Sequence, residues 1–409
     1  MTKDKSPFYP DQPVPVELFA GRIAQIERIL IRGVGQVAAG KPVTMFVQGE
    51  YGIGKSSIAG FVQRHAETHC GLHSIYTSLG GAKNLDDVAF SILQATLRSG
   101  AFDPKKSEKM RHWLAKYIGK QDMFGISINL DALRKDAPNL SNPFGILEFL
   151  SAAKVRLQEE GVKGIFLVLD EINGISTTPE FAHFIKGLVD TNALSQEPLP
   201  LLLILCGVEE RRREMIAQHE PVDRIFDVID IEPMNKVELE DFFKRAFYSA
   251  QMEVTPEAMA YLVYFSAGFP KIMHLIGNNA YWTDKDGIID EEDARQAIIF
   301  AADEVGKKYV DQQVYKALRS DDYHAILKKI AALTPSVAFS FKKSDVEAAL
   351  TDTEKNKFHN FLQKMKKLNV LRSGSTPGEY IFNQRMVRLY LWLQSQKQEK
   401  NSKITPVDT

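Results

Sequence analysis

A glycine-rich loop at residues 49–56 carries the residue types that hold a polyphosphate. Its sequence, Gly-Glu-Tyr-Gly-Ile-Gly-Lys-Ser, fits the pattern G-x-x-x-x-G-K-[ST], and it lies between an apolar run at 43–47 and a helical pattern at 57–65. The glycines let the backbone wrap an anion, so that peptide N–H groups and the helix N-terminus face it. A glycine-rich turn with an unrelated lysine would not need this strand–loop–helix context. The loop therefore predicts binding of ATP or GTP.

Two side chains of this loop have specific expected roles. Lys55 would reach the β- and γ-phosphates, and the Ser56 hydroxyl would complete the coordination shell of Mg²⁺. The residues of this segment that we expect to contact the nucleotide are Gly49, Glu50, Tyr51, Gly52, Ile53, Gly54, Lys55, Ser56 and Ser57. A nucleoside triphosphate and Mg²⁺ are therefore the expected cofactors.

A second motif supplies the carboxylates that such a loop needs. Residues 164–169 form an apolar run, typical of a central strand in a parallel sheet, and Asp170 and Glu171 follow it. Asp170 would hold Mg²⁺ through water, and Glu171 would polarise the attacking water. A strand that merely ends in an acidic turn is the alternative, which the loop at 49–56 disfavours. Because open parallel sheets bind ligands at the carboxyl ends of their strands, we expect both motifs at one edge, and we predict hydrolysis.

The composition limits the class of protein around these motifs. A chain of 409 residues with 44% hydrophobic and 25% charged residues is typical of a globular protein with about two or three domains. No apolar stretch in the sequence is long enough for a membrane span, and we expect no secretion signal. The only cysteines, Cys70 and Cys206, cannot form a disulfide framework or a metal site. A cytoplasmic location without membrane association is predicted.

Strands and helices alternate around the two motifs. Further buried strands are predicted at 72–78, 200–206 and 227–231, and a helix is predicted to begin after Asn84 as its cap. The alternation stops at 101–142, where basic and aromatic residues precede a segment that alternates like a strand. We interpret 101–142 as an insertion, and exposed decoration without a function is the simpler explanation of it.

Two shorter motifs extend the pattern. Leu18-Phe19-Ala20-Gly21-Arg22 precedes the first predicted helix and strand, and Gly268-Phe269-Pro270-Lys271 lies among later helices. Together with the loop and the acidic pair, they resemble AAA+ ATPases, closest to the initiator-like clade and similar archaeal-type ATPases. The resemblance implies that Phe19 lies against the adenine and that Lys271 reaches the γ-phosphate from a helical lid. Such a cation would give ATP and ADP different contact energies, as a switch requires. Without the resemblance, 268–271 is only a turn before a helix.

The sequence departs from the AAA+ pattern at one position and leaves another open. The strand end that usually carries a polar first sensor has Cys206 here, so no good donor is evident. Arg224 lies where the family places its arginine finger, which stabilises transition-state charge across a subunit boundary. A surface ion pair explains Arg224 equally well. A finger role would make hydrolysis depend on assembly.

The C-terminal part reads as two helical modules. Residues 235–305 show apolar residues at helical spacing, which predicts a helical lid. Residues 311–395 read as three helices followed by a hairpin, the order of a winged helix, which initiator-like ATPases often carry after the lid. The end of the chain, 396–409, is polar and is expected to be disordered.

The third helix of this module has a cationic and amide-bearing side that could enter a major groove. The residues expected to contact DNA are Lys355, Asn356, Lys357, Asn360, Lys364 and Arg372. Positive residues outnumber negative ones from residue 311 onward, which suits an acidic partner, although solvated lysines explain it equally well. A winged helix that contacts protein remains the alternative.

The sequence thus predicts an α/β protein: a P-loop AAA+ core with a parallel sheet (1–234), an α-helical lid (235–305) and a winged-helix domain. Lys55, Glu171 and Arg224 would be catalytic, and Ser56 and Asp170 would hold the metal. The expected function is a Mg-ATP-hydrolysing switch that acts with double-stranded DNA in replication, transposition or defence. The alternative is a STAND-like signalling or assembly ATPase. We expect a nucleotide-dependent homo-oligomer or a protein partner.

Overall fold

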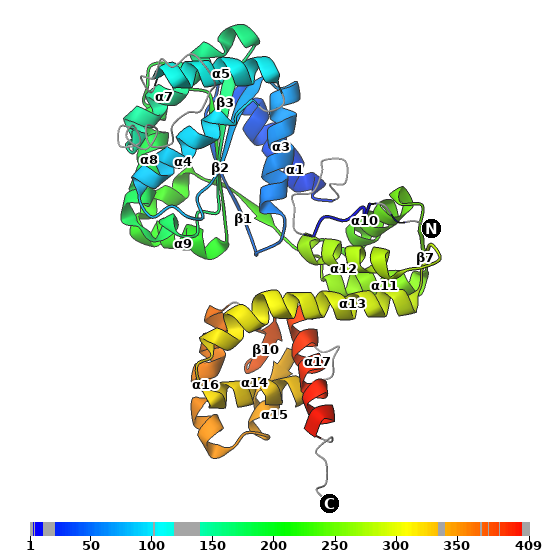
Figure 1. The fold of residues 1–409 in the computed structure, drawn as a ribbon. Coiled ribbons are helices and arrows are strands. Elements are labelled where there is room, and N and C mark those ends of the chain that lie inside the picture. Colours follow the sequence, from blue (N-terminus) through cyan, green and yellow to red (C-terminus); the bar gives the residue numbers. More distant parts are fainter. Residues whose placement is uncertain are drawn as a thin grey trace, which may run out of the picture. The chain divides into compact units, whose positions relative to one another are not determined.

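The computed structural model has two compact units. The P-loop unit is Pro13–Pro233, and the C-terminal unit combines Met1–Gln12 with Met234–Thr409 (Figure 1). The structure describes residues 3, 5–10, 21–100, 103–117, 140–333, 340–368, 370–374, 376–383 and 385–402. Within these ranges, no helix combines the length and the apolar character needed to cross a membrane.

The P-loop unit is built on a five-stranded parallel sheet with the strand order β2-β3-β4-β1-β5. Its strands are β1 (Val43–Gly49), β2 (Leu72–Ser78), β3 (Gly164–Asp170), β4 (Leu201–Gly207) and β5 (Asp227–Ile231). The predicted strands agree with these bounds within two residues. Since every strand runs in the same direction, the loop after β1 and the acidic end of β3 lie at one edge of the sheet.

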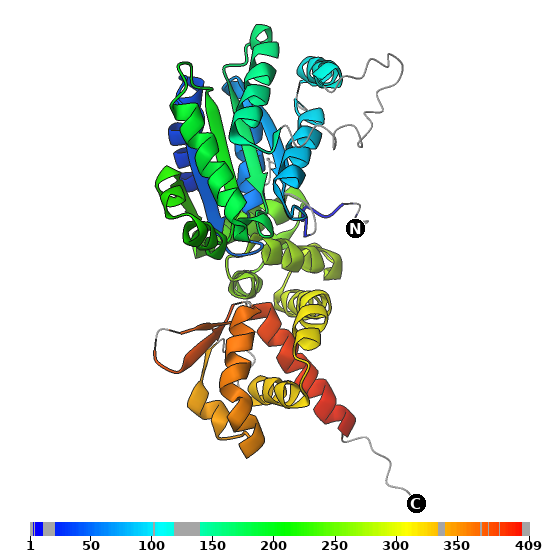
Figure 2. The same cartoon turned by 90° about the vertical axis from the view of Figure 1, so that its left-hand side faces the viewer.

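Helices lie on both faces of this sheet (Figure 2). They are α1 (Ile23–Ile29), η2 (Leu30–Val34), α2 (Gly35–Ala38), α3 (Lys55–His69), α4 (Leu85–Leu97), α5 (Pro104–Tyr117), α7 (Pro143–Arg156), α8 (Pro179–Ala193) and α9 (Glu209–Gln218), with short turns η3 (Gln158–Glu160), η4 (Ile175–Thr177) and η5 (Glu220–Ile225). The predicted cap is confirmed, since the Asn84 side chain accepts a hydrogen bond from the Asp87 N–H at 2.9 Å. Of the expected insertion at 101–142, the structure describes 103–117, which contains α5, and 140–142. The segment that alternates like a strand, at 124–130, lies outside the described residues.

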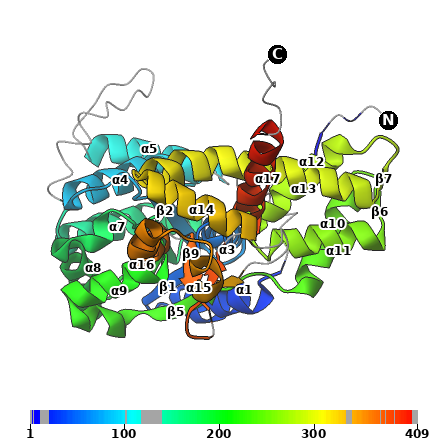
Figure 3. The same cartoon turned by 90° about the horizontal axis from the view of Figure 1, so that it is seen from below.

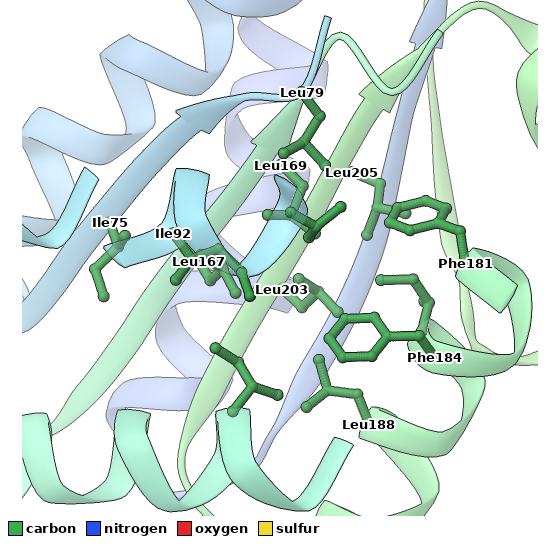
Figure 4. Close-up of a cluster of buried hydrophobic side chains, with 14 of the residues drawn as sticks. Ile75, Leu79, Ile92, Leu167, Leu169, Phe181, Phe184, Leu188, Leu203 and Leu205 are labelled. Carbon is green, nitrogen blue, oxygen red and sulfur yellow. The ribbon is translucent and has the colours of Figure 1, made fainter. Parts of the chain in front are cut away.

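One continuous apolar cluster fixes the sheet against α4, α7 and α8. Ile75 of β2, Leu167 of β3 and Leu203 of β4 point to the same side as Phe181 and Leu188 of α8 (Figure 4). Each of these side chains is almost fully buried, which contributes about 1.5–3 kcal/mol per residue to folding. The cluster holds the strand ends in register and so positions the residues that follow them.

The first part of the C-terminal unit is a helical bundle, as the sequence predicts. Its helices are α10 (Lys236–Ser249), α11 (Pro256–Ser266), α12 (Pro270–Thr283) and α13 (Glu291–Val305), joined by the short parallel pair β6 (Glu253–Val254) and β7 (Ile288–Ile289). Capping boxes begin α10 and α13, where the side chains of Asn235 and Asp290 accept the N–H groups of Glu238 and Asp293.

The N-terminal segment packs with this bundle, whereas the sequence predicts it within the core domain 1–234. Phe8 is 4% exposed, and its ring lies 4.9 Å from that of Phe247 and 6.0 Å from that of Phe242. A Cβ on Gly277 would lie only 2.2 Å from the Phe8 ring, so glycine is needed there. The gain from burying an aromatic ring explains why these residues leave the core domain.

The rest of the C-terminal unit is the winged helix. After η6 (Gly306–Tyr315) come α14 (Asp321–Leu333), β8 (Ser340–Lys342), α15 (Lys343–Glu347), α16 (Asp352–Lys367), β9 (Leu371–Ser373), β10 (Glu379–Phe382) and α17 (Arg385–Ser402). The predicted hairpin is joined by β8, which the sequence did not indicate, in the sheet order β8-β10-β9. Figure 3 labels α14, α15, α16 and β9 of this module. The sequence predicts a disordered tail at 396–409, but α17 continues to Ser402. The buried residues Val387 and Leu391 anchor α17 to the winged helix.

Candidate nucleotide site

Glycine geometry shapes the loop between β1 and α3. Gly49 ends β1, and a Cβ there would lie 2.6 Å from the backbone oxygen of Ile231. Gly52 and Gly54 have φ angles of 75° and 103°, which other residues adopt only with strain. Gly54 is the residue before the first turn of α3, so the loop delivers its free N–H groups to the helix N-terminus. This arrangement can surround a phosphate.

Lys55 begins α3 and folds back over the loop. Its Nζ donates hydrogen bonds to the carbonyl oxygens of Gly49 and Glu50 at 2.9 and 2.8 Å. Burial lowers the pKa of Lys55, an effect that the nearby carboxylates of Asp170, Glu50 and Glu171 oppose. Carbonyl oxygens are neutral acceptors, so an anionic phosphate would compete for this ammonium group with a stronger interaction.

Asp170 lies at the centre of a hydrogen-bond network. It is 3% exposed, and its Oδ2 accepts hydrogen bonds from the Ser56 hydroxyl at 2.5 Å and from the Tyr76 hydroxyl. Its Oδ1 accepts the N–H of Glu171 at 2.8 Å. A hydroxyl and a carboxylate side by side are ligands that suit Mg²⁺. No group of three or more His, Cys, Asp or Glu that could hold a metal ion occurs in the described ranges.

Glu171 follows directly and has a strained backbone. Its φ is 54°, the left-handed region that few non-glycine residues occupy, and such strain is typical of functional positions. The side chain is exposed, and its Oε2 accepts a hydrogen bond from the Ser78 hydroxyl at 2.6 Å. A Cβ on Gly80 would lie 3.0 Å from the same Oε2. Ser78 at the end of β2 therefore holds the Glu171 carboxylate toward the neighbouring strand.

The N-terminal motif contributes an arginine rather than only an aromatic ring. Arg22 is 5% exposed and donates from Nη2 to the carbonyl oxygen of Ile53 at 3.1 Å. Its φ of 63° follows that of Gly21 at 68°, so the chain turns sharply to bring this side chain under the loop. Phe19, expected against the adenine, lies outside the described residues. The sequence motif includes Arg22, but nothing in the sequence predicts that Arg22 binds the carbonyl oxygen of Ile53.

Arg224 differs from the other arginines of this region. It is exposed in η5, and no hydrogen bond or ion pair joins it to any residue that the structure describes. Arg211 and Arg213, by contrast, pair with acids of their own helix, Glu214 and Glu209. Arg212 pairs with Asp223 and donates to Gln48 at the end of β1. Surface ion pairs thus explain Arg211, Arg212 and Arg213. Arg224 has no such partner among the described residues and could contact a group of another molecule.

The position of the expected first sensor is a buried thiol. Cys206 pairs with Val47 of β1 in the middle of the sheet and is 0% exposed. Burial raises the pKa of Cys206 well above its ordinary value, so at neutral pH it offers only a weak S–H donor. The structure agrees with the sequence that no strong donor stands at this point.

Lys271 belongs to the C-terminal unit, whereas the residues above belong to the P-loop unit. It is exposed in the first turn of α12, after a turn in which Ala267 and Gly268 have φ angles of 53° and 82°. These angles direct the chain into α12, where Pro270 begins the helix. The expected role of Lys271 needs a nucleotide held by the other unit.

The winged helix presents its predicted face to solvent. Phe358, Phe361, Leu362 and Met365 of α16 are buried, while Lys355, Asn356, Lys357, Asn360 and Lys367 are exposed, Lys364 is half-buried and Arg372 of β9 is exposed. Lys357 pairs with Asp322 of α14, and Lys355 lies 3.9 Å from Asp352. Lys364 and Lys367 have no ion pair with any residue in the described part of the chain.

A phosphate-binding loop on a five-stranded parallel sheet, followed by a helical bundle, is the fold of the AAA+ P-loop ATPases, and this chain has a winged helix after it. Two solved structures have this fold over nearly their whole length. The Walker-type ATPase paby2304 of Pyrococcus abyssi has a TM-score of 0.58 and 16% identity, covering 91% of this chain and 96% of that chain. The ORC2 protein of Aeropyrum pernix, in its ADPNP–ADP complexes, has a TM-score of 0.60 and 14% identity, covering 98% and 99%.

No family model and no curated protein matches the chain. Because the identities to the solved structures are so low, the similarity establishes the fold alone. It confirms the α/β architecture and the AAA+ likeness that the motifs predicted.

Proposed function

We propose that this protein binds Mg-ATP in the P-loop unit, hydrolyses it slowly and changes shape or assembly with nucleotide state. The observation that carries the proposal is the convergence of Lys55, Ser56, Asp170 and Glu171 at one edge of the parallel sheet. The ORC2 protein of the same fold occurs in ADPNP–ADP complexes, which supports an adenine nucleotide as the ligand.

The chain's own groups would then act in sequence. The N–H groups of the loop would bind the phosphates, and Lys55 would leave the carbonyl oxygens of Gly49 and Glu50 to meet them. Ser56 and Asp170 would hold Mg²⁺, which supplies neutralisation of the charge on the phosphate oxygens. The Glu171 carboxylate would orient the attacking water and accept its proton.

Groups outside this edge would complete the site. Phe19 would lie against the adenine, Lys271 would approach the γ-phosphate from the lid, and Arg224 would stabilise the transition state from a second copy of the chain. In this proposal, residues 235–305 are the lid and residues 311–395 are the winged-helix domain. The free cysteines suit a reducing cytoplasm.

The winged helix would bind double-stranded DNA. The exposed lysines and amides of α16 support this, because a cationic helix can enter the major groove while lysines meet phosphates. The rival is a signalling or assembly ATPase in which this face binds protein. Phosphate contacts make DNA affinity fall steeply with salt, a property that a protein interface need not have.

The first experiment is ATP turnover as a function of protein concentration, with and without duplex DNA, at low and moderate salt. Turnover that rises with concentration and again with DNA at low salt is the expected result. Turnover that depends neither on protein concentration nor on DNA would indicate an ATPase that acts as a single chain, and the search would then turn to protein partners. An absence of Mg-dependent turnover in every condition would refute the proposed activity.

A further inference from the structure

Tyr76 reaches the metal-binding half of the nucleotide site from the edge strand β2. In the parallel pairing of β2 with β3, Tyr76 lies beside Val168 and Ser78 beside Asp170. The Tyr76 hydroxyl donates to Asp170 Oδ2, the same oxygen that accepts the Ser56 hydroxyl.

The two donors come from opposite sides of the carboxylate. Ser56 belongs to α3, which follows β1, whereas Tyr76 stands on β2 at the far side of β3. Among the described residues, the Asp170 side chain is hydrogen-bonded by Ser56, Tyr76 and the Glu171 N–H. When the Ser56 oxygen turns a lone pair to a metal ion, Tyr76 and the Glu171 N–H still fix the carboxylate.

We propose that Tyr76 is a positioning residue for Mg²⁺: it holds the Asp170 carboxylate at the angle at which it acts together with Ser56 on the metal. This inference rests on the proposed function. Outer-shell partners orient metal ligands in this way, and their loss typically lowers metal affinity about 10–100-fold. No motif of the phosphate-binding pattern includes Tyr76, since its place follows only from the register of β2 against β3.

Tyr76→Phe tests the proposal, because phenylalanine keeps the ring and removes only the hydroxyl. ATP binding to the full chain is measured by calorimetry, once with Mg²⁺ and once with EDTA. We expect the affinity in EDTA to stay within about twofold and the tightening by Mg²⁺ to fall about tenfold, with the Mg²⁺ concentration for half-maximal turnover rising equally. In an Asp170→Asn background, Tyr76→Phe should have no further effect on the Mg²⁺ response.

Tyr390→Phe is the matched control. The Tyr390 hydroxyl also donates to a carboxylate, since it lies 2.9 Å from both oxygens of Asp311. This pair belongs to the C-terminal unit and not to the nucleotide site. It should leave the Mg²⁺ response unchanged. An unchanged response in Tyr76→Phe, or an equal loss of affinity in EDTA, would overturn the positioning role. A wild-type chain whose ATP affinity ignores Mg²⁺ would instead overturn the proposed function itself.

Discussion

The candidate nucleotide site and the α16 face both consist of polar side chains, but their surroundings differ. At the sheet edge, Ser56, Tyr76 and the Glu171 N–H converge on one carboxylate that is 3% exposed. On α16, Lys355, Lys357 and Lys367 are exposed, and a pair such as Lys355–Asp352 has side chains that are 46% and 101% exposed. Buried polar groups depend on each other, whereas exposed charges act almost independently.

This difference predicts how each region responds to substitution. In the candidate nucleotide site a single substitution should change binding or turnover strongly, because it leaves other buried polar groups without hydrogen-bond partners. On α16 single changes should be small, and their effects should add. Arg224 is an exception to this rule, because it is exposed and yet its removal should lower turnover strongly.

Arg224→Ala should have the largest effect. An arginine finger contributes about 10³–10⁵-fold to turnover, so the variant should bind ATP normally and hydrolyse it about a thousandfold more slowly or worse. Arg213→Ala is the control, since Arg213 is exposed and pairs with Glu209 of its own helix.

Mixing two inactive variants tests the trans position of Arg224 directly. Arg224→Ala keeps an intact Glu171, and Glu171→Gln keeps an intact Arg224. If the finger acts across a boundary, the mixture should regain part of the turnover that each lacks alone. A mixture as inactive as its components would contradict the trans role.

Glu171→Gln should lower turnover about 10²–10⁴-fold, because the amide cannot accept a proton from water. Mg-ATP affinity should be retained, since the neighbouring Asp170 and Ser56 are unchanged. The measurement is single-turnover hydrolysis beside nucleotide binding, with Glu180→Gln, an exposed glutamate in the first turn of α8, as control. Unchanged hydrolysis in Glu171→Gln would remove it from the catalytic role.

On α16, a combined Lys355, Lys357, Lys364 and Lys367 to Gln variant should weaken duplex DNA binding about 100-fold near 0.1 M salt. The slope of log affinity against log salt should fall by up to about 0.9 for each phosphate that a lysine no longer neutralises. The control replaces Lys307, Lys308 and Lys343, which pair with acids of neighbouring helical turns. Equal binding by both variants would favour the protein-contact alternative.

Much of the fold and part of the site can be predicted from the sequence. The strands β3 (Gly164–Asp170) and β4 (Leu201–Gly207) are predictable because buried parallel strands are continuous apolar runs. The loop at 49–56 and the Asp170–Glu171 pair are recognisable because backbone geometry and charge restrict residue types there. On α16, helical spacing alone separates the buried Phe358 and Phe361 from the exposed lysines.

The features that the sequence does not predict depend on interactions between distant segments. Tyr76 and Ser78 have no local signature, and their roles follow from the register of β2 against β3. Phe8 joins the lid through Gly277, which no local pattern links to it. The helix α17 continues to Ser402 through a polar stretch because its buried first half is anchored in the winged helix.

The smallest predicted effect comes from Ser78, which is exposed and bonds the exposed carboxylate of Glu171. Its hydroxyl holds Glu171 Oε2 at 2.6 Å on the side of β2. Because an exposed hydrogen bond of this kind contributes about 0.5–1.5 kcal/mol, Ser78→Ala should free the carboxylate to turn toward water and raise basal turnover about threefold. Ser78→Thr keeps the donor and should behave like the wild type. A fall in turnover for Ser78→Ala would show instead that the bond orients Glu171 productively, and this exposed hydrogen bond would then act like the buried ones around Asp170.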